Sequence, residues 1–196
     1  MFRLAFLLCF LSLSQAPLAQ QSPTAIPSDT CPVTKSYLTS LFVPPSPYPA
    51  KAPTGLFWFG SDRLWTALPV NGTWKGLPHY TPSDPTFRQK LFFYRQGYDW
   101  HTDPPSRLTA TGKRLDAAAP PLLSDRANNG WVRPDQPFIV TGINLPTLGC
   151  WEITARYQDD DLSFVIWVDV NSHVNRRKAK AHIRLQYQVE YQNPSN

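Results

Sequence analysis

Glutamate is nearly absent from this chain: only two of its 196 residues are glutamates. Valine, isoleucine, threonine and aromatic residues are plentiful by contrast, with eleven Phe, eight Tyr and seven Trp. Glutamate favours helices, whereas β-branched and aromatic side chains favour strands. The composition therefore argues against long helices and predicts an all-β fold.

Sequence motifs that would indicate common enzyme chemistries are also missing. The chain has no Gly-x-Ser-x-Gly, no glycine-rich phosphate loop, no His-Glu-x-x-His and no dinucleotide fingerprint. It has no Cys-x-x-Cys pair of the kind that structural zinc sites use. We therefore expect no cofactor, and the sequence names no catalytic residue.

The body of the chain has no excess of positive charge outside the C-terminal segment. The net charge is +5, but residues 20–170 hold thirteen Lys and Arg against thirteen Asp and Glu. The remaining excess lies mainly in residues 171–196, in the cluster Arg176, Arg177, Lys178 and Lys180. A basic face spread over a domain would indicate nucleic acid, whereas one short basic segment does not. The segment is predicted to be a solvated hairpin loop, with contact to an anionic lipid or cell-wall polymer as the alternative.

The first residues have the layout of a secretory signal peptide. Arg3 precedes an apolar run from Leu4 to Leu13, and small residues follow up to Ala19. Such a run is short for a membrane span, and an uncleaved N-terminal anchor is the lesser alternative. We expect residues 1–19 to be removed on export to the periplasm or beyond, and no transmembrane segment to remain.

Two cysteines, Cys31 and Cys150, remain after the signal peptide. In an oxidising compartment a small, even number of cysteines favours pairing, so the sequence predicts one disulfide between them. This bond would hold the N-terminal segment close to the start of a C-terminal strand. Two free thiols are the alternative.

The mature chain divides into a proline-rich, extended leader at 20–54, a β-domain at 55–192 and a short tail at 193–196. Proline removes backbone donors, so the leader should lack ladder hydrogen bonds. Turn signals such as Asn71-Gly72 and Asn129-Gly130 separate short apolar runs in the domain, which is typical of a sandwich or barrel. We predict strands at Leu56–Phe59, Leu64–Leu68, Gln89–Tyr94, Leu108–Leu115, Phe138–Ile143, Trp151–Tyr157, Leu162–Val170 and Ile183–Tyr191.

A hairpin within Gly149–Val170 shows the clearest alternation. Apolar residues occupy every second position, which predicts one buried and one exposed face. The expected inward rows are Trp151, Ile153, Ala155 and Tyr157, then Leu162, Phe164, Ile166 and Val168. Asp159, Asp160 and Asp161 should form the turn between them, with calcium binding as a lesser alternative. Val165 and Trp167 lie on the other face, which suggests that the second strand is covered on both sides.

The phrase Gly-Cys-Trp-Glu-Ile-Thr-Ala-Arg, with a proline before it and an acidic turn after it, resembles the penultimate hairpin of bacterial immunoglobulin-like domains. Together with FWFGSDRLWTALP and Lys113–Asp116, it looks like uncharacterised secreted proteins of environmental bacteria. The resemblance covers Gly55 to Val170. It implies an immunoglobulin-like antiparallel β-sandwich and an exported protein, and it brings no catalytic residues. Cys31 departs from the usual disulfide of such domains because it lies in the leader.

Two groups of side chains are candidates for a functional site. Asp99, His101 and Asp103 alternate, so an extended chain would present all three on one side, as a metal or acid/base site requires. A solvated strand end before Pro104-Pro105 is the simpler interpretation. The tryptophans near predicted turns could form a platform on which a ligand stacks, although packing in the core is the favoured explanation; these are Trp58, Trp65, Trp100 and Trp131.

Three functions remain open from the sequence. We favour a non-enzymatic binding or accessory module at the cell envelope, with a glycan or envelope polymer as partner. The alternatives are a hydrolase that uses the Asp99, His101 and Asp103 group, and a purely structural envelope protein.

Overall fold

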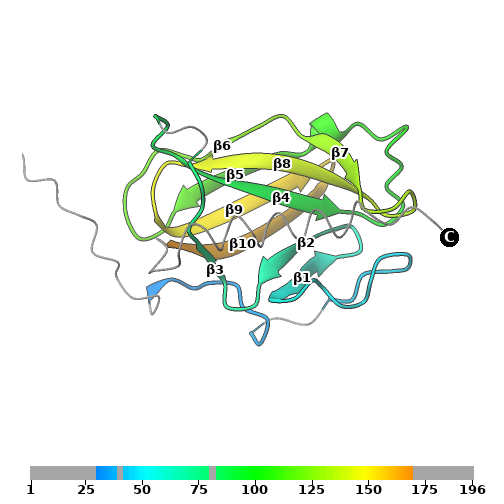
Figure 1. Cartoon of the computed structure of the whole chain (residues 1–196), viewed down its shortest axis with the longest axis horizontal. Helices are drawn as coiled ribbons and strands as arrows, with labels where there is room; N and C mark the ends of the chain where they lie inside the picture. Colours follow the sequence, from blue (N-terminus) through cyan, green and yellow to red (C-terminus); the bar gives the residue numbers. More distant parts are fainter. Residues whose placement is uncertain (1–29, 39–41, 80–82, 170–196) are drawn as a thin grey trace, which may run out of the picture.

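The computed structural model describes residues 30–38, 42–79 and 83–169 (Figure 1). No α-helix occurs in these ranges, and none of their segments is a helix long and apolar enough to cross a membrane. The predicted all-β class is therefore confirmed. The strands are β1 (Leu56–Ser61), β2 (Leu64–Pro69), β3 (Thr73–Lys75), β4 (Phe87–Tyr94), β5 (Thr109–Arg114), β6 (Leu123–Ser124), β7 (Asn128–Trp131), β8 (Pro137–Leu145), β9 (Gly149–Tyr157) and β10 (Asp160–Asp169).

The strands form two sheets. The first sheet has the order β1-β2-β4-β8-β6, and β7 also pairs with β8. The second sheet has the order β3-β10-β9-β5. Every described pairing is antiparallel except that of β3 with β10, which is parallel.

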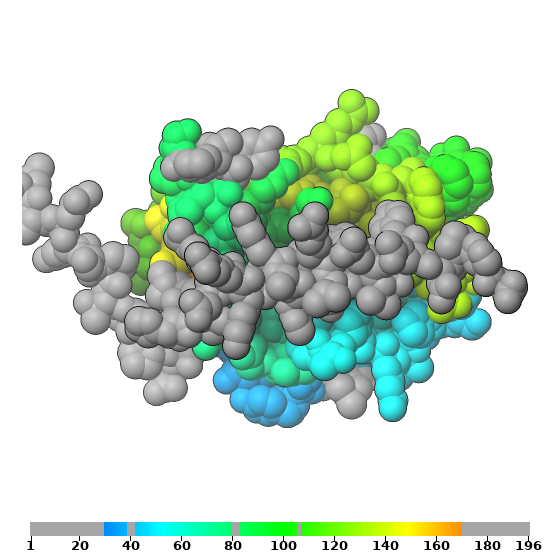
Figure 2. All heavy atoms as spheres, viewed as in Figure 1, coloured from blue at the N-terminus to red at the C-terminus, as the bar shows by residue number. Residues whose placement is uncertain are grey.

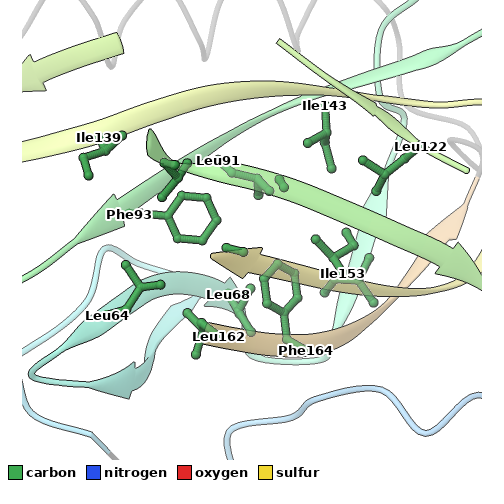
Figure 3. Packing of buried hydrophobic residues seen from close by; sticks show 14 of the residues in the cluster. Leu64, Leu68, Leu91, Phe93, Leu122, Ile139, Ile143, Ile153, Leu162 and Phe164 are labelled. Atoms are coloured by element: carbon green, nitrogen blue, oxygen red, sulfur yellow. The ribbon is translucent and has the colours of Figure 1, made fainter. Parts of the chain in front are cut away.

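A single large core lies between the two sheets, as the side chains in Figure 3 show. Leu91 and Phe93 of β4 point into it from the first sheet, and Ile153 and Phe164 point into it from the second. All eight residues of the predicted inward rows of β9 and β10 are buried. The two-residue alternation thus identified the core face of this hairpin correctly.

The turn of that hairpin differs from the prediction. β9 ends at Tyr157 and β10 begins at Asp160, so only Gln158 and Asp159 form the turn. Asp160 is buried and its carboxylate pairs with Arg63 at 2.7 Å and with Arg95 at 3.0 Å. A side chain held by two guanidinium groups has its charge compensated by protein, so Asp160 is an ion-pair partner and not a residue of an acidic turn.

The disulfide between Cys31 and Cys150 is present, with 5.7 Å between the two Cα atoms. It places the leader beside the start of β9, as predicted. The Thr34 N–H donates to the Val165 carbonyl at 2.8 Å, and the Thr34 hydroxyl accepts from the Val165 N–H at 2.9 Å. Cys31, Val33 and Cys150 pack with Trp167 on the outer side of β10. This strand is therefore covered on both faces.

A second part of the leader covers aromatic side chains on the outer face of the first sheet. Phe42 and Tyr48 lie with their ring centroids 5.5 Å and 5.2 Å from that of Trp65. Gln136 donates its side-chain amide to the Pro47 carbonyl at 2.6 Å, which ties the leader to the domain. In the space-filling view, the described leader residues and β1 (blue to cyan) gather along one long side of the molecule (Figure 2).

Asp116 holds the backbone next to the disulfide. Its Oδ1 accepts from Arg114 Nε at 2.7 Å and from the Cys150 N–H at 3.1 Å. Partial burial alone would raise the pKa of Asp116, but these hydrogen bonds outweigh burial and lower it below its usual value.

Because the pKa of Asp116 is lower in the folded state, its carboxylate stabilises the fold above the unfolded pKa of about 4, and this contribution is lost as the pH falls through the folded pKa. We expect Asp116→Asn to reduce the free energy of unfolding by about 1 kcal/mol at pH 7. Urea unfolding at pH 7 and at pH 2 measures this. An equal loss at both pH values would contradict it.

Some predicted segments lie outside the described residues. They are the signal peptide at 1–19, the strand Ile183–Tyr191, the basic cluster Arg176, Arg177, Lys178 and Lys180, and the tail at 193–196. These stay predictions.

Candidate functional site

Four connections meet at one end of the two sheets, which we call the loop end: residues 62–63, 95–108, 132–136 and 158–159. The Gln96 N–H donates to the Asp62 carbonyl at 2.8 Å, which joins the first two. Arg95 donates to Asp160 at 3.0 Å, which joins the β4–β5 loop to the β9–β10 turn. Register places the β7–β8 turn at this same end, because Phe93 near the end of β4 pairs with Ile139 near the start of β8.

Three rings form an aromatic stack at the loop end: His101, Trp100 and Trp131. The ring centroids of Trp100 and Trp131 are 5.0 Å apart with a 30° angle between the planes. Those of Trp100 and His101 are 3.7 Å apart, at 34°. Trp131 is 54% exposed although it is a large apolar residue.

Tyr98 and Asn129 fix the position of the aromatic stack. Tyr98 is buried, and its hydroxyl donates to the side-chain oxygen of Asn129. The Asn129 amide in turn donates to the Trp100 carbonyl at 3.0 Å. Burial raises the pKa of Tyr98 above its usual value, so the hydroxyl remains a donor throughout the physiological range. One asparagine on β7 thereby connects the strand that carries Trp131 to the loop that carries Trp100.

Asp99, His101 and Asp103 do lie close together, but in a turn and not along an extended strand. Asp99 accepts hydrogen bonds from the His101 N–H at 2.9 Å and the Thr102 hydroxyl at 3.1 Å, and its Oδ1 lies 3.1 Å from His101 Nδ1. The Asp99 N–H donates to Asp103 Oδ2 at 2.9 Å. The hydrogen bond from the His101 backbone is the main cause that lowers the pKa of Asp99.

The extended arrangement predicted for these three residues is therefore wrong. Their carboxylates close the turn by accepting local backbone and side-chain hydrogen bonds, as Asp does in many turns. Within the described ranges, no group of three or more His, Cys, Asp and Glu side chains is arranged to hold a metal ion.

Two of the four candidate tryptophans lie elsewhere and are buried. Trp65 is 0% exposed and Trp58 is 6% exposed, because both lie in the aromatic layer under the leader. The Trp58 indole N–H donates to the Pro49 carbonyl at 2.9 Å. Neither fits an exposed stacking platform. The sequence around Trp58 and Trp65 did not reveal this, because no local pattern indicates that the leader folds over β1 and β2.

Asn129-Gly130 lies in β7 and not in a turn, contrary to the prediction. A Cβ atom on Gly130 would lie 2.3 Å from the ring of Phe138, so glycine permits the close approach of β7 to that ring. The strand position places Asn129 and Trp131 on the same face, two residues apart. The role of Asn129 was missed because Asn-Gly is a common turn signal.

The stack thus unites Trp100 and Trp131 with the Asp99, His101 and Asp103 group, two candidates that the sequence treated separately. It places an exposed tryptophan ring in one stack with an imidazole that lies beside a carboxylate. Comparison of the chain with models of known protein families and with curated proteins finds no match.

Proposed function

We propose that this chain is an exported immunoglobulin-like β-sandwich that binds a ligand at its loop end, as a non-enzymatic module of the cell envelope. The observation that carries the proposal is the exposed Trp131 of the aromatic stack, which is backed by Trp100, whose carbonyl accepts a hydrogen bond from Asn129. Adjacent aromatic rings that stay exposed on a fixed support are typical of binding surfaces, whereas a single exposed ring is not.

The sheet order supports the immunoglobulin-like assignment. The neighbours β2-β4-β8-β6 in one sheet and β5-β9-β10 in the other correspond to the orders A-B-E-D and C-F-G of that fold. In this correspondence β4–β5 and β9–β10 are the B–C and F–G connections, which carry the binding site in antibody variable domains. This part of the argument is an analogy between folds. The disulfide departs from the pattern, because it joins β9 to the leader.

Export is supported by the signal-like residues 1–19 and by the disulfide. Disulfides persist in oxidising compartments and are rare in the cytosol. The disulfide between Cys31 and Cys150 is therefore the kind of bond expected in an exported protein.

The rival hydrolase is less well supported. A general acid or base has to reach a reacting group, whereas the Asp99 carboxylate accepts three hydrogen bonds within its own turn. A purely structural role does not require Trp131 to remain exposed. Binding accounts for both the exposed ring and the rigid support beneath it.

The proposal predicts that Trp131→Ala reduces retention of the processed protein on isolated bacterial cell envelopes by at least about tenfold, as expected for a central aromatic residue of a binding site. Tyr37→Ala is the matched control, because Tyr37 is 71% exposed and lies in the leader. Co-sedimentation of each variant with envelope fragments measures retention. Equal retention of the wild type and Trp131→Ala, or none for either, would contradict the proposed function.

A further inference from the structure

We infer that the ligand of the aromatic stack is an uncharged glycan, one pyranose ring of which lies on the exposed face of Trp131. This inference rests on the proposed function and specifies the ligand of the same site. It follows from three properties of the stack: its shape, its hydrogen-bonding groups and its charge.

The shape of the site is a flat ring surface. Trp131 stacks on Trp100 with 30° between the ring planes, and Trp131 is still 54% exposed. A flat apolar surface fits a ligand that itself has a flat apolar face. The C–H side of a pyranose ring is such a face, whereas an extended peptide presents alternating side chains. The ring is also fixed before binding, so little entropy is lost when a small rigid ligand stacks on it.

The polar groups beside the stack match hydroxyl groups. Asp103 supplies a carboxylate that accepts one hydrogen bond within the turn, at Oδ2 from the Asp99 N–H, and carboxylate oxygens only accept hydrogen bonds. His101 directs Nδ1 toward Asp99, so Nε2 lies on the opposite side of its ring, and its side chain is 67% exposed. A sugar hydroxyl both donates and accepts, and can therefore pair with a carboxylate and with an imidazole nitrogen at once.

The charges of the two segments that carry the stack cancel. Residues 98–107 and 126–136 contain three aspartates and three arginines: Asp99, Asp103, Asp135, Arg107, Arg126 and Arg133. The neighbouring Arg63 and Arg95 share one aspartate, Asp160, and Asp62 and Asp159 lie in the adjoining turns, so these segments add no excess of positive charge. A site for a polyanion, such as a phosphate polymer or nucleic acid, would show an excess of positive charge, and a site for a polycation the reverse. The balance favours a neutral ligand.

The test compares three oligosaccharide sets of matched length: neutral β-linked glucose and N-acetylglucosamine oligomers, anionic galacturonate oligomers and cationic glucosamine oligomers. Binding is followed by the indole N–H signals of the tryptophans in NMR titrations of the processed protein. We expect a neutral set to bind with a Kd on the order of 1 mM, as suits a small ligand on one ring. Trp131→Ala should weaken binding at least about tenfold, and Trp131→Phe should restore most of it.

Salt distinguishes the ligand classes. Affinity for an uncharged glycan should change less than about twofold between 0.05 and 1 M NaCl, because no ionic contacts are screened. Tighter binding of a charged set, or a strong loss of affinity in salt, would overturn the inference but leave the proposed function intact. Retention on envelopes that depends on Trp131 without binding of any oligosaccharide would do the same. A dimer that is lost in Trp131→Ala on gel filtration would show that a second copy covers the ring, and would overturn both.

Discussion

Removal of the Cys31–Cys150 disulfide should lower the free energy of unfolding by about 4–5 kcal/mol. The bond closes a loop between residues 119 apart in sequence, and a long loop loses much conformational entropy in the unfolded state when it is cross-linked. For a domain of this size, such a loss corresponds to a fall in Tm of roughly 10–20 °C. Thermal unfolding of the wild type and of the Cys31→Ser, Cys150→Ser double variant, followed by circular dichroism, measures it.

The structure adds a local reason for a large effect. Cys31 and Val33 pack with Trp167 on the outer side of β10, and the leader reaches β10 through two hydrogen bonds at Thr34. Without the bond, release of this segment exposes Trp167 to water. A reducing agent should lower the Tm of the wild type and leave the double variant unchanged. A wild-type Tm that does not respond to reduction, with both thiols then shown to be free, would contradict the prediction.

Trp151→Ala should destabilise the domain by about 4 kcal/mol, within the range that buried tryptophan truncations show. Trp151 is 0% exposed, lies near the start of β9 and packs in the core between the sheets. Its indole N–H also donates to the Thr147 carbonyl at 3.0 Å, so truncation both creates a cavity and removes this hydrogen bond. Urea unfolding gives the change in free energy.

The same substitution at Trp131 is the matched control, because this tryptophan is exposed. Trp131→Ala should change the free energy of unfolding by less than about 0.5 kcal/mol while it abolishes most binding. Trp151→Phe should recover about half of the lost stability, since it keeps a ring in the core but no N–H donor. A Trp151→Ala protein as stable as the wild type would show that Trp151 is not a core residue.

The strand-forming regions were determined by local sequence. In β9 and β10 every second residue is apolar. A strand with this period presents one row of apolar side chains on a single face, and that face packs in the core. Short strands were less predictable. β3, β6 and β7 are two to four residues long and carry few apolar residues, so they exist through pairing with β10 and β8 and not through a pattern of their own.

The site itself was predicted only as separate parts. Trp100, Trp131 and the Asp99, His101 and Asp103 group were identified as candidates, but the sequence does not say that residues 98–103 meet β7. That meeting depends on Asn129, whose side chain bonds to Tyr98 and to the Trp100 carbonyl. The local sequence also does not indicate which tryptophans stay exposed. Trp65 is buried because Phe42 and Tyr48 of the leader pack on it.

Composition and periodicity by themselves determined the β class, the core face of the main hairpin and the pairing of the two cysteines. These depend on short-range backbone geometry and on simple counting, which act within a segment. The tertiary structure alone decided which rings are buried and which form the aromatic stack. Exposure is set by what packs on a side chain from distant parts of the chain, and here the leader and β7 made that difference.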